Sequence, residues 1–198
     1  DILIITGRGK RAIEDHFDTA YELENELSTA HKDELLALVR SVQPADMVCS
    51  YVRQARSLGL GHAVLCAERL VGNEPFAVLL ADDLMTGPPG GTGVLSQMVA
   101  AFEKMGRSML AVQEVPADQV RRYGIVAGEP AGRNLIRLEK IVEKPAPEEA
   151  PSRMGVAGRY ILTPRIFHHL ENVRPGAGGE IQLTDGIASL LSEEQVLA

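Results

Sequence analysis

The chain has 198 residues, of which 45% are hydrophobic and 24% are charged, a composition typical of globular proteins. Its formal net charge of -7 argues against a nucleic-acid or anionic-membrane surface, because either would need a basic face. Cys49 and Cys66 lack metal-ligand spacing, and no apolar run approaches the roughly 20 residues that span a bilayer, so we expect a cytoplasmic protein that binds neither nucleic acid nor membrane.

Apolar runs alternate with amphipathic segments through the first half of the chain. Continuous apolar runs at 1–5, 47–52 and 76–81 predict buried strands, and helically spaced apolar residues predict two helices over 11–39 and one over 61–71. Strands that alternate with helices connect by right-handed crossovers into a mainly parallel sheet covered on both faces. Ligands then bind at the carboxyl ends of the strands.

The pattern changes in the second half of the chain. After a helix over 95–105 and a strand over 108–115, the segments 123–127 and 135–142 flank a turn rich in Gly, Pro and Asn and predict an antiparallel pair. The remaining expected elements are a short strand and two helices, at 159–162, 164–170 and 183–191. The predicted fold is α/β, a doubly wound, mainly parallel sheet with a small inserted antiparallel β region, in one domain.

Asp82 and Asp83 directly follow the apolar run at 76–81, which places at least one carboxylate at the mouth of the predicted sheet. Magnesium prefers one or two carboxylates together with substrate phosphates, so the pair is a candidate metal site. The alternative is an Asp that caps the following loop, and spacing alone leaves both interpretations open.

The turn after the second strand carries Gln54 and Gly59. A side-chain amide can make two complementary hydrogen bonds to a pyrimidine edge, and a glycine lets the backbone approach a flat base. The alternative is a plain strand-to-helix turn, in which His62 is a helix-start residue rather than a catalyst. The glycines and lysine at 7–10 lack the Walker spacing, so no phosphate loop is predicted there.

Glu143 and Lys144 follow the second antiparallel strand. There a carboxylate can accept two sugar hydroxyls, and an ammonium group can neutralise phosphate. An exposed surface ion pair is the alternative. Thr184 and Asp185 stand where the last helix begins and could equally serve as its cap.

Taken together, these motifs resemble the bacterial UTP:glucose-1-phosphate uridylyltransferases, in that family's order and over essentially the whole chain. The segments that carry the resemblance are 6–18, 54–63, 79–83, 142–145, 158–160 and 180–185. Each motif alone is weak, but the combination is specific. The resemblance implies a Rossmann-like nucleotidyltransferase fold.

The resemblance also implies a reaction, in which UTP and glucose 1-phosphate form UDP-glucose and pyrophosphate. A phosphate oxygen of the sugar phosphate attacks the α-phosphorus of UTP in line, so no protein nucleophile is required. Mg²⁺ would be held by Asp82 and, as second ligand, Asp185. These two carboxylates and Lys144 are the catalytic residues that the resemblance implies.

Substrate contacts follow in the same way from the resemblance. Gln54 and Gly59 would read the uracil. Gly124 would lie against the glucose, Glu143 would bind its hydroxyls, and Lys144 would contact the sugar phosphate.

The beginning of the chain departs from the family pattern. Members start with a strand and a G-x-G-T-R loop that embraces the triphosphate, and they carry further C-terminal structure that supports oligomer contacts. We therefore expect residues 1–198 to lack both parts and to show no turnover by themselves, and we expect the complete protein to be a homo-oligomer.

Two other functions remain open from the sequence. One is a related nucleotidyltransferase, such as a thymidylyltransferase, or a retaining glycosyltransferase that takes another nucleotide or sugar. The other is a non-catalytic nucleotide-sugar-binding subunit. A nucleotide-preference assay separates the first from a uridylyltransferase, and the full reading frame bears on the second.

Overall fold

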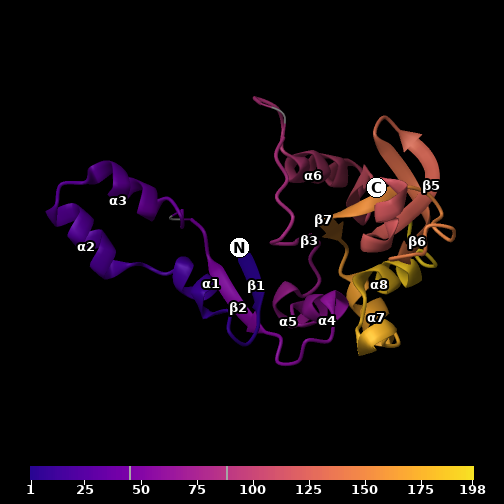
Figure 1. Cartoon of the computed structure of the whole chain (residues 1–198), viewed down its shortest axis with the longest axis horizontal. Coiled ribbons are helices and arrows are strands. Elements are labelled where there is room, and N and C mark those ends of the chain that lie inside the picture. The colour runs from indigo at the N-terminus through magenta and orange to yellow at the C-terminus, as the bar shows by residue number, and fades with distance from the viewer. Residues whose placement is uncertain (45, 88) are drawn as a thin grey trace. The chain divides into compact units, whose positions relative to one another are not determined.

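The computed structural model describes residues 1–44, 46–87 and 89–198, which form two compact units, Asp1–Ser57 and Leu58–Ala198 (Figure 1). The first unit contains two strands and three helices: β1 (Ile2–Thr6), α1 (Arg11–His16), α2 (Tyr21–Thr29), α3 (Asp33–Arg40) and β2 (Cys49–Arg53). The two strands pair in parallel, with Ile2 opposite Cys49 and Thr6 opposite Arg53. The parallel pairing that the sequence predicts is therefore present in this unit.

Three helices replace the two that we expected over 11–39. The backbone N–H groups of Phe17 and Asp18 bond to carbonyls only three residues back, which closes α1 with a tight turn. The sequence Phe17–Ala20 contains Asp and Thr, which are weak helix formers and so favour a break here. The next two helices form a hairpin, in which Arg40 Nε on α3 donates to Glu24 Oε2 on α2 at 2.8 Å.

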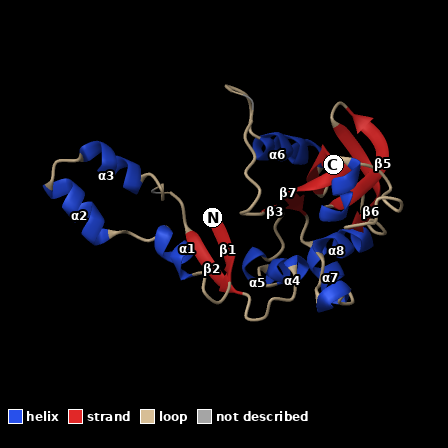
Figure 2. Cartoon of the chain, viewed as in Figure 1, coloured by secondary structure: helices blue, strands red, loops and turns tan. Residues whose placement is uncertain are grey.

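The second unit is built on a sheet with helices beside it (Figure 2). Its strands are β3 (Phe76–Leu79), β4 (Met109–Glu114), β5 (Gly124–Gly132), β6 (Leu135–Glu143) and β7 (Met154–Leu162). Its helices are α4 (Leu60–Leu65), α5 (Glu68–Val71), α6 (Val94–Met105), α7 (Arg165–Asn172) and α8 (Leu183–Leu190), with short 3₁₀ turns at Ala117–Arg122 and Ala177–Gly179. The α/β class and the antiparallel β5–β6 pair that the sequence predicts are confirmed.

The centre of this sheet is β7, which spans nine residues instead of the four expected. It pairs antiparallel with β3, β4 and β5, with β3 and β4 on its opposite edges. Because β3 and β4 are both antiparallel to β7, they run in the same direction. They do not pair with each other, because β7 lies between them. For this reason the named strands of the described second unit pair only antiparallel, and β1–β2 is the parallel pair.

The last three residues belong to the same sheet. Leu197 exchanges backbone hydrogen bonds with the start of β4, at 2.9 Å to Ser108 O and 3.0 Å from Leu110 N. On its other side Ala198 exchanges bonds of 2.8 and 2.7 Å with Ile136 of β6. The hydrogen bonds therefore link β4, β7, β5, β6 and residues 196–198 in a closed circuit.

Alternate side chains of β4 and β7 enter two different cores. Leu110, Tyr160 and Leu162 pack in one cluster with residues of α4, α7 and α8, whereas Met109 and Ile161 pack in another with residues of α6. Because side chains alternate across a strand, α6 and the other helices cover opposite faces (Figure 1). Both faces at the centre of the sheet are therefore buried.

The edge strand β3 is covered less completely than its apolar sequence predicts. Phe76, Val78 and Leu80 pack against the larger core, and the Phe76 ring stacks on Phe167 with centroids 5.0 Å apart. Leu79, which points the other way, is 52% exposed. This segment thus behaves as a strand with one buried face.

The single helix expected over 61–71 is divided into α4 and α5 near Cys66 and Ala67. The segment still ends as predicted at Gly72, whose φ of 63° is readily adopted only by glycine. In the described parts of the chain, no helix is both long and apolar enough to cross a membrane.

The register of the β5–β6 ladder shifts between Ala127 and Gly128, and this irregularity gives a test of the sheet. A methyl group on Gly128 would overlap the carbonyl oxygen of Arg137 and lie 2.8 Å from its carbon, so backbone would have to move. Gly128→Ala should cost about 1 to 3 kcal/mol in free energy of unfolding, measured by chemical denaturation. Gly93→Ala is the control, since nothing lies within 4 Å of a Cβ there, and it should cost less than about 1 kcal/mol. Equal losses would contradict the close approach at Gly128.

Candidate active site

Glu143 is the centre of a polar cluster at the end of β6. It pairs with Gly124 of β5 across the antiparallel ladder. Its Oε1 lies 3.5 Å from Lys144 Nζ, and its Oε2 accepts a 2.9 Å hydrogen bond from Thr184 Oγ1 on α8. The structure therefore brings three of the predicted site residues, Gly124, Glu143 and Lys144, together with the start of α8.

Lys144 adopts an unusual backbone conformation for its residue type. Its φ is 43°, in the left-handed region, and its N–H donates to Tyr123 O at 3.0 Å. Such conformations cost free energy, and they cluster at functional sites. The turn leaves the Lys144 side chain 59% exposed, while the Glu143 side chain is 24% exposed. An exposed cation thus lies beside a half-buried carboxylate.

Gly124 is buried where α8 approaches β5. A Cβ here would lie 2.7 Å from Thr184 Cγ2 and 3.4 Å from Glu143 Oε2. Any side chain would push Thr184 away from the carboxylate that it holds. The absence of a side chain at Gly124 is therefore needed for this cluster, independently of any ligand.

The sequence interpretation of Thr184 as a helix cap is wrong. The N-cap of α8 is Gln182, no side-chain cap hydrogen bond is present, and Thr184 lies inside the helix at 6% exposure. Its hydroxyl is used by Glu143, which is 41 residues earlier in the sequence. Spacing could not reveal this partner, because the contact depends on how α8 packs on β5 and β6.

The two aspartates after β3 point into different surroundings. Asp83 is half-buried, and its carboxylate covers Gly158 of β7 so closely that a Cβ on Gly158 would lie 2.8 Å from Asp83 Cγ. Gly158 has a φ of 42° as well. Asp82 is exposed. Asp83 thus packs against the sheet, and Asp82 presents its carboxylate to solvent.

The Tyr160 hydroxyl is affected by the charges of both Glu143 and Asp83. Its phenol is buried, with 4% exposure, and burial together with the charges of Glu143 and Asp83 raises the pKa of the Tyr160 hydroxyl above its ordinary value of 10.0. Both carboxylates must lie near this ring to act on it. The sequence motif 158–160 gave Tyr160 no individual role, because a tyrosine in a strand is most often core.

Asp185 lies in α8, and Gly59 packs against the segment that leads into this helix. Asp185 is exposed in the first turn of α8, and a Cβ on Gly176 would be 3.7 Å from its Oδ2. Gly59 has a φ of 95°, and a Cβ there would lie 2.7 Å from Ile181 O. Backbone hydrogen bonds of 2.7 and 2.8 Å join residues 58 and 61 to Ile181. The turn that carries Gly59 is therefore fixed to the segment that leads into α8.

Gln54 belongs to the first unit, where it follows β2. Its backbone N–H donates to Thr6 O at 2.8 Å, which extends the parallel ladder by one bond. Gln54 thus lies at the carboxyl ends of β1 and β2, where an α/β sheet binds its ligands. Thr6 Oγ1 donates in turn to Glu14 Oε1 at 3.1 Å and ties α1 to this edge.

A resident cation would have to use few protein ligands. Among the described residues no group of three or more His, Cys, Asp and Glu side chains is arranged to hold a metal. Asp82 and Asp185 offer exposed carboxylate oxygens, which suit Mg²⁺ because it takes one or two carboxylates and completes its shell with water and phosphate. The chemistry of each carboxylate therefore suits magnesium that arrives with a substrate.

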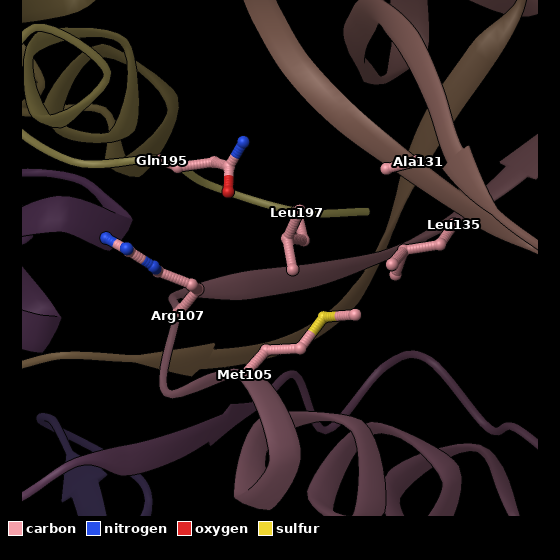
Figure 3. Close-up of a pocket in the computed structure, with 6 residues that line it drawn as sticks. All are labelled: Met105, Arg107, Ala131, Leu135, Gln195 and Leu197. Atoms are coloured by element: carbon pink, nitrogen blue, oxygen red, sulfur yellow. The ribbon is translucent and has the colours of Figure 1, made fainter.

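Two hollows in the described surface of the second unit lie elsewhere. One of about 270 Å³ is lined by Met105, Arg107, Ala131, Leu135, Gln195 and Leu197 (Figure 3). Another, of about 340 Å³, shares Arg107 and Gln195 with it. None of the predicted site residues lines either hollow, so we give them no part in the site.

The chain is similar to known proteins over its whole length. A family model described as nucleotidyl transferase matches residues 1–198. A UTP–glucose-1-phosphate uridylyltransferase of Pseudomonas aeruginosa is 48% identical over all of this chain, which spans 70% of that protein. One of Bacillus subtilis is 45% identical over 199 residues, and the chain spans 65% of it.

Solved structures give the same result. The crystal structure of a UDP-glucose pyrophosphorylase complexed with UDP-glucose matches 99% of this chain and 70% of its own, with 41% identity and a TM-score of 0.89. A UTP-bound enzyme from Acinetobacter baumannii matches 99% of this chain and 68% of its own, with 41% identity and a TM-score of 0.87.

Tyr160 gives a prediction about stability and pH. Because its pKa is raised in the folded state, its contribution to stability is complete below the unfolded pKa of about 10 and is lost as pH rises further. Tyr160→Phe should therefore lose less stability between pH 9 and pH 11 than the parent protein, as followed by denaturant unfolding. Tyr21→Phe is the control, since Tyr21 is 71% exposed, and it should follow the parent. Identical pH dependence in all three proteins would contradict the environment assigned to Tyr160.

Proposed function

The chain belongs to the nucleotidyl transferase family, and within it to the UTP–glucose-1-phosphate uridylyltransferases, and from this premise we propose how its residues serve the reaction. The reaction joins UTP and glucose 1-phosphate into UDP-glucose and pyrophosphate. The observation that carries the assignment of a site is the cluster of Gly124, Glu143, Lys144 and Thr184. The family match spans both units, which supports a single nucleotidyltransferase domain over 1–198.

Glucose 1-phosphate binds at this cluster in our proposal. The Glu143 carboxylate accepts hydrogen bonds from sugar hydroxyls, and Thr184 holds one of its oxygens in place at 2.9 Å. Gly124, which lies beside Glu143 and lets Thr184 approach it, would face the glucose, and Lys144 contributes a cation for the sugar phosphate. The exposed Lys144 side chain can swing from Glu143 toward a phosphate, because the pair at 3.5 Å is solvent-accessible and weak.

The uracil of UTP is read by Gln54 and Gly59 in this proposal. Gln54 is placed at the carboxyl ends of β1 and β2, and an amide side chain has the donor and acceptor that a pyrimidine edge requires. Gly59 is half-buried and has a φ of 95°, a conformation that a residue without Cβ reaches readily. Each feature separately supports contact with a flat base.

Asp82 and Asp185 are the residues that would hold Mg²⁺. Asp82 is preferred to Asp83, because Asp83 packs its carboxylate against Gly158 whereas Asp82 is exposed. When bound, the cation would neutralise phosphate charge as the two anions meet and would orient the α-phosphate. Two unit charges at about 4 Å repel by about 4 kcal/mol at an effective dielectric of 20, so positive charge is needed where the substrates meet.

The chain's own residues then act mainly by position. Glu143 and Gly124 fix the sugar so that its phosphate oxygen faces the α-phosphorus, and Gln54 and Gly59 fix the other end of UTP. Lys144 screens the attacking phosphate. The attack expels pyrophosphate in line and needs no protein nucleophile.

The setting of the reaction is also part of the proposal. An acidic chain with two free thiols, Cys49 and Cys66, fits a cytoplasmic enzyme. The resemblance to the family supports a homo-oligomer as the working form of the complete protein.

Asp82→Asn in the complete protein should abolish turnover and leave the fold intact. Removing one ligand charge weakens Mg²⁺ binding, whereas the exposed side chain contributes little to packing. Steady-state rates at several Mg²⁺ concentrations and the unfolding midpoint measure the two effects. Asp118→Asn, at an exposed position in the 3₁₀ turn, is the control. Near-normal rates at ordinary Mg²⁺ would remove Asp82 from the site and make Asp83 the next residue to test.

Glu143→Ala and Gln54→Ala should damage different substrates. Loss of a buried hydrogen bond to a substrate costs about 1 to 3 kcal/mol, so we expect at least about a tenfold rise in KM for glucose 1-phosphate with the first variant and for UTP with the second. Glu148→Ala, at an exposed position near Glu143, controls for loss of negative charge. If both variants harm both substrates equally, this division of roles is wrong.

A further inference from the structure

We infer that Arg159 is a positioning residue, which holds the acidic turn after β3 in the orientation that the proposed Mg²⁺ site requires. The inference deepens the proposed function and rests on it, since it takes Asp82 as a metal-binding carboxylate. Arg159 itself touches neither substrate nor metal in this account. It acts through the backbone that carries Asp82 and Asp83.

The guanidinium group of Arg159 binds three carbonyl oxygens. Its Nη1 donates to Leu80 O at 3.0 Å and to Gly158 O at 2.9 Å, and its Nη2 donates to Asp83 O at 2.6 Å. Leu80 and Asp83 lie on either side of Asp82 in sequence. The side chain therefore fastens both ends of the segment that presents Asp82.

The backbone of the same segment is bonded to β7 as well. Leu80 N donates to Gly158 O at 2.9 Å, one residue beyond the last registered pair, Leu79 with Arg159. Asp83 N donates to Leu80 O at 3.3 Å, which closes a turn. The backbone ladder between β3 and β7 stops where β3 ends. Beyond that point, the Arg159 side chain provides the hydrogen bonds that link the two segments.

Gly158, the residue before Arg159, also helps to position the acidic turn. With a φ of 42° and no side chain, it lets the Asp83 carboxylate lie directly over it. This contact turns Asp83 toward the sheet, while Arg159 holds its carbonyl. Asp82, which lies between Leu80 and Asp83 in the same turn, is exposed to solvent.

Arginine suits this task better than lysine. Its planar group carries five N–H donors in a fixed fork, whereas an ammonium group is a single charged point on a flexible stem. No carboxylate of the described residues lies within ion-pair distance of Arg159, so its donors are used for carbonyls. Lysine would keep the charge but could not span Leu80 and Asp83 in the same way.

The test compares Arg159→Gln and Arg159→Lys with Arg153→Gln in the complete protein. Arg153 precedes β7 and contacts Glu114 at an exposed position, so it controls for loss of a positive charge near the same strand. Five quantities are measured: kcat, the Mg²⁺ concentration for half-maximal rate, KM for glucose 1-phosphate, hydrogen exchange of a peptide covering residues 80–84, and the unfolding midpoint.

If the turn is displaced, the dependence on Mg²⁺ should change more than KM for glucose 1-phosphate. We expect Arg159→Gln to raise the half-maximal Mg²⁺ concentration about tenfold or more and to lower kcat by about ten- to a hundredfold, since misplacement of about 1 Å can cost a hundredfold. KM for glucose 1-phosphate should change less than about threefold. Exchange in the 80–84 peptide should quicken, and Arg159→Lys should restore only part of each property. Arg153→Gln should match the parent protein.

Two outcomes overturn the inference. A lower unfolding midpoint for Arg159→Gln with unchanged Mg²⁺ dependence and unchanged exchange would show a merely structural role. Full recovery by Arg159→Lys would show that charge alone is needed, and this variant decides the question if Arg159→Gln does not fold. Asp82→Asn is assayed in parallel, because normal rates for that variant would reject the proposed metal site itself, whereas an inactive Asp82→Asn beside a normal Arg159→Gln would reject only the role of Arg159.

Discussion

The position of β7 between β3 and β4 is the constraint on which the second unit depends. Its pairings on both edges set the directions of three other strands, and its alternating side chains contribute to two hydrophobic cores. The same strand carries Gly158, which the Asp83 carboxylate covers, and Tyr160, whose pKa is raised by burial and by the charges of Glu143 and Asp83. Packing and chemistry therefore share one element, and a shift of β7 would disturb both.

Close backbone approach explains several glycines of the site without reference to a ligand. Gly59, Gly124 and Gly158 each face a neighbour that leaves no space for a Cβ, namely Ile181 O, the Thr184 methyl group and the Asp83 carboxylate. In each case the neighbour belongs to another element of the site region. These glycines let α8, β5, β7 and the turns come close enough for their polar groups to meet. Substrate contact at Gly59 and Gly124 would be an added use of positions that packing already requires.

Electrostatics sets the other requirement of the site. The chain is acidic overall, yet its substrates are anions, so favourable interactions must be local. Lys144 supplies a cation next to Glu143, and Arg159 donates its hydrogen bonds to carbonyl groups instead of neutralising a carboxylate. The remaining acidic groups, Asp82 and Asp185, are exposed and suit a divalent cation that arrives with phosphate. An acidic protein would thus depend on such local positive charge to bind two anions.

The sequence by itself determined where most strands and helices lie, though not all their bounds, and, through the order of its motifs, the family and its reaction. Apolar periodicity and glycine stops are local properties, so β1, β2, α6 and the β5–β6 pair were found within a few residues. Only the tertiary structure decided that β7 enters between β3 and β4, because strand order depends on pairings between distant segments. It also decided that Thr184 serves Glu143 instead of capping its own helix, and that Asp83 packs inward while Asp82 faces solvent. These are contacts across 41 or more residues, and no spacing along the chain records them, since they arise from how whole elements pack.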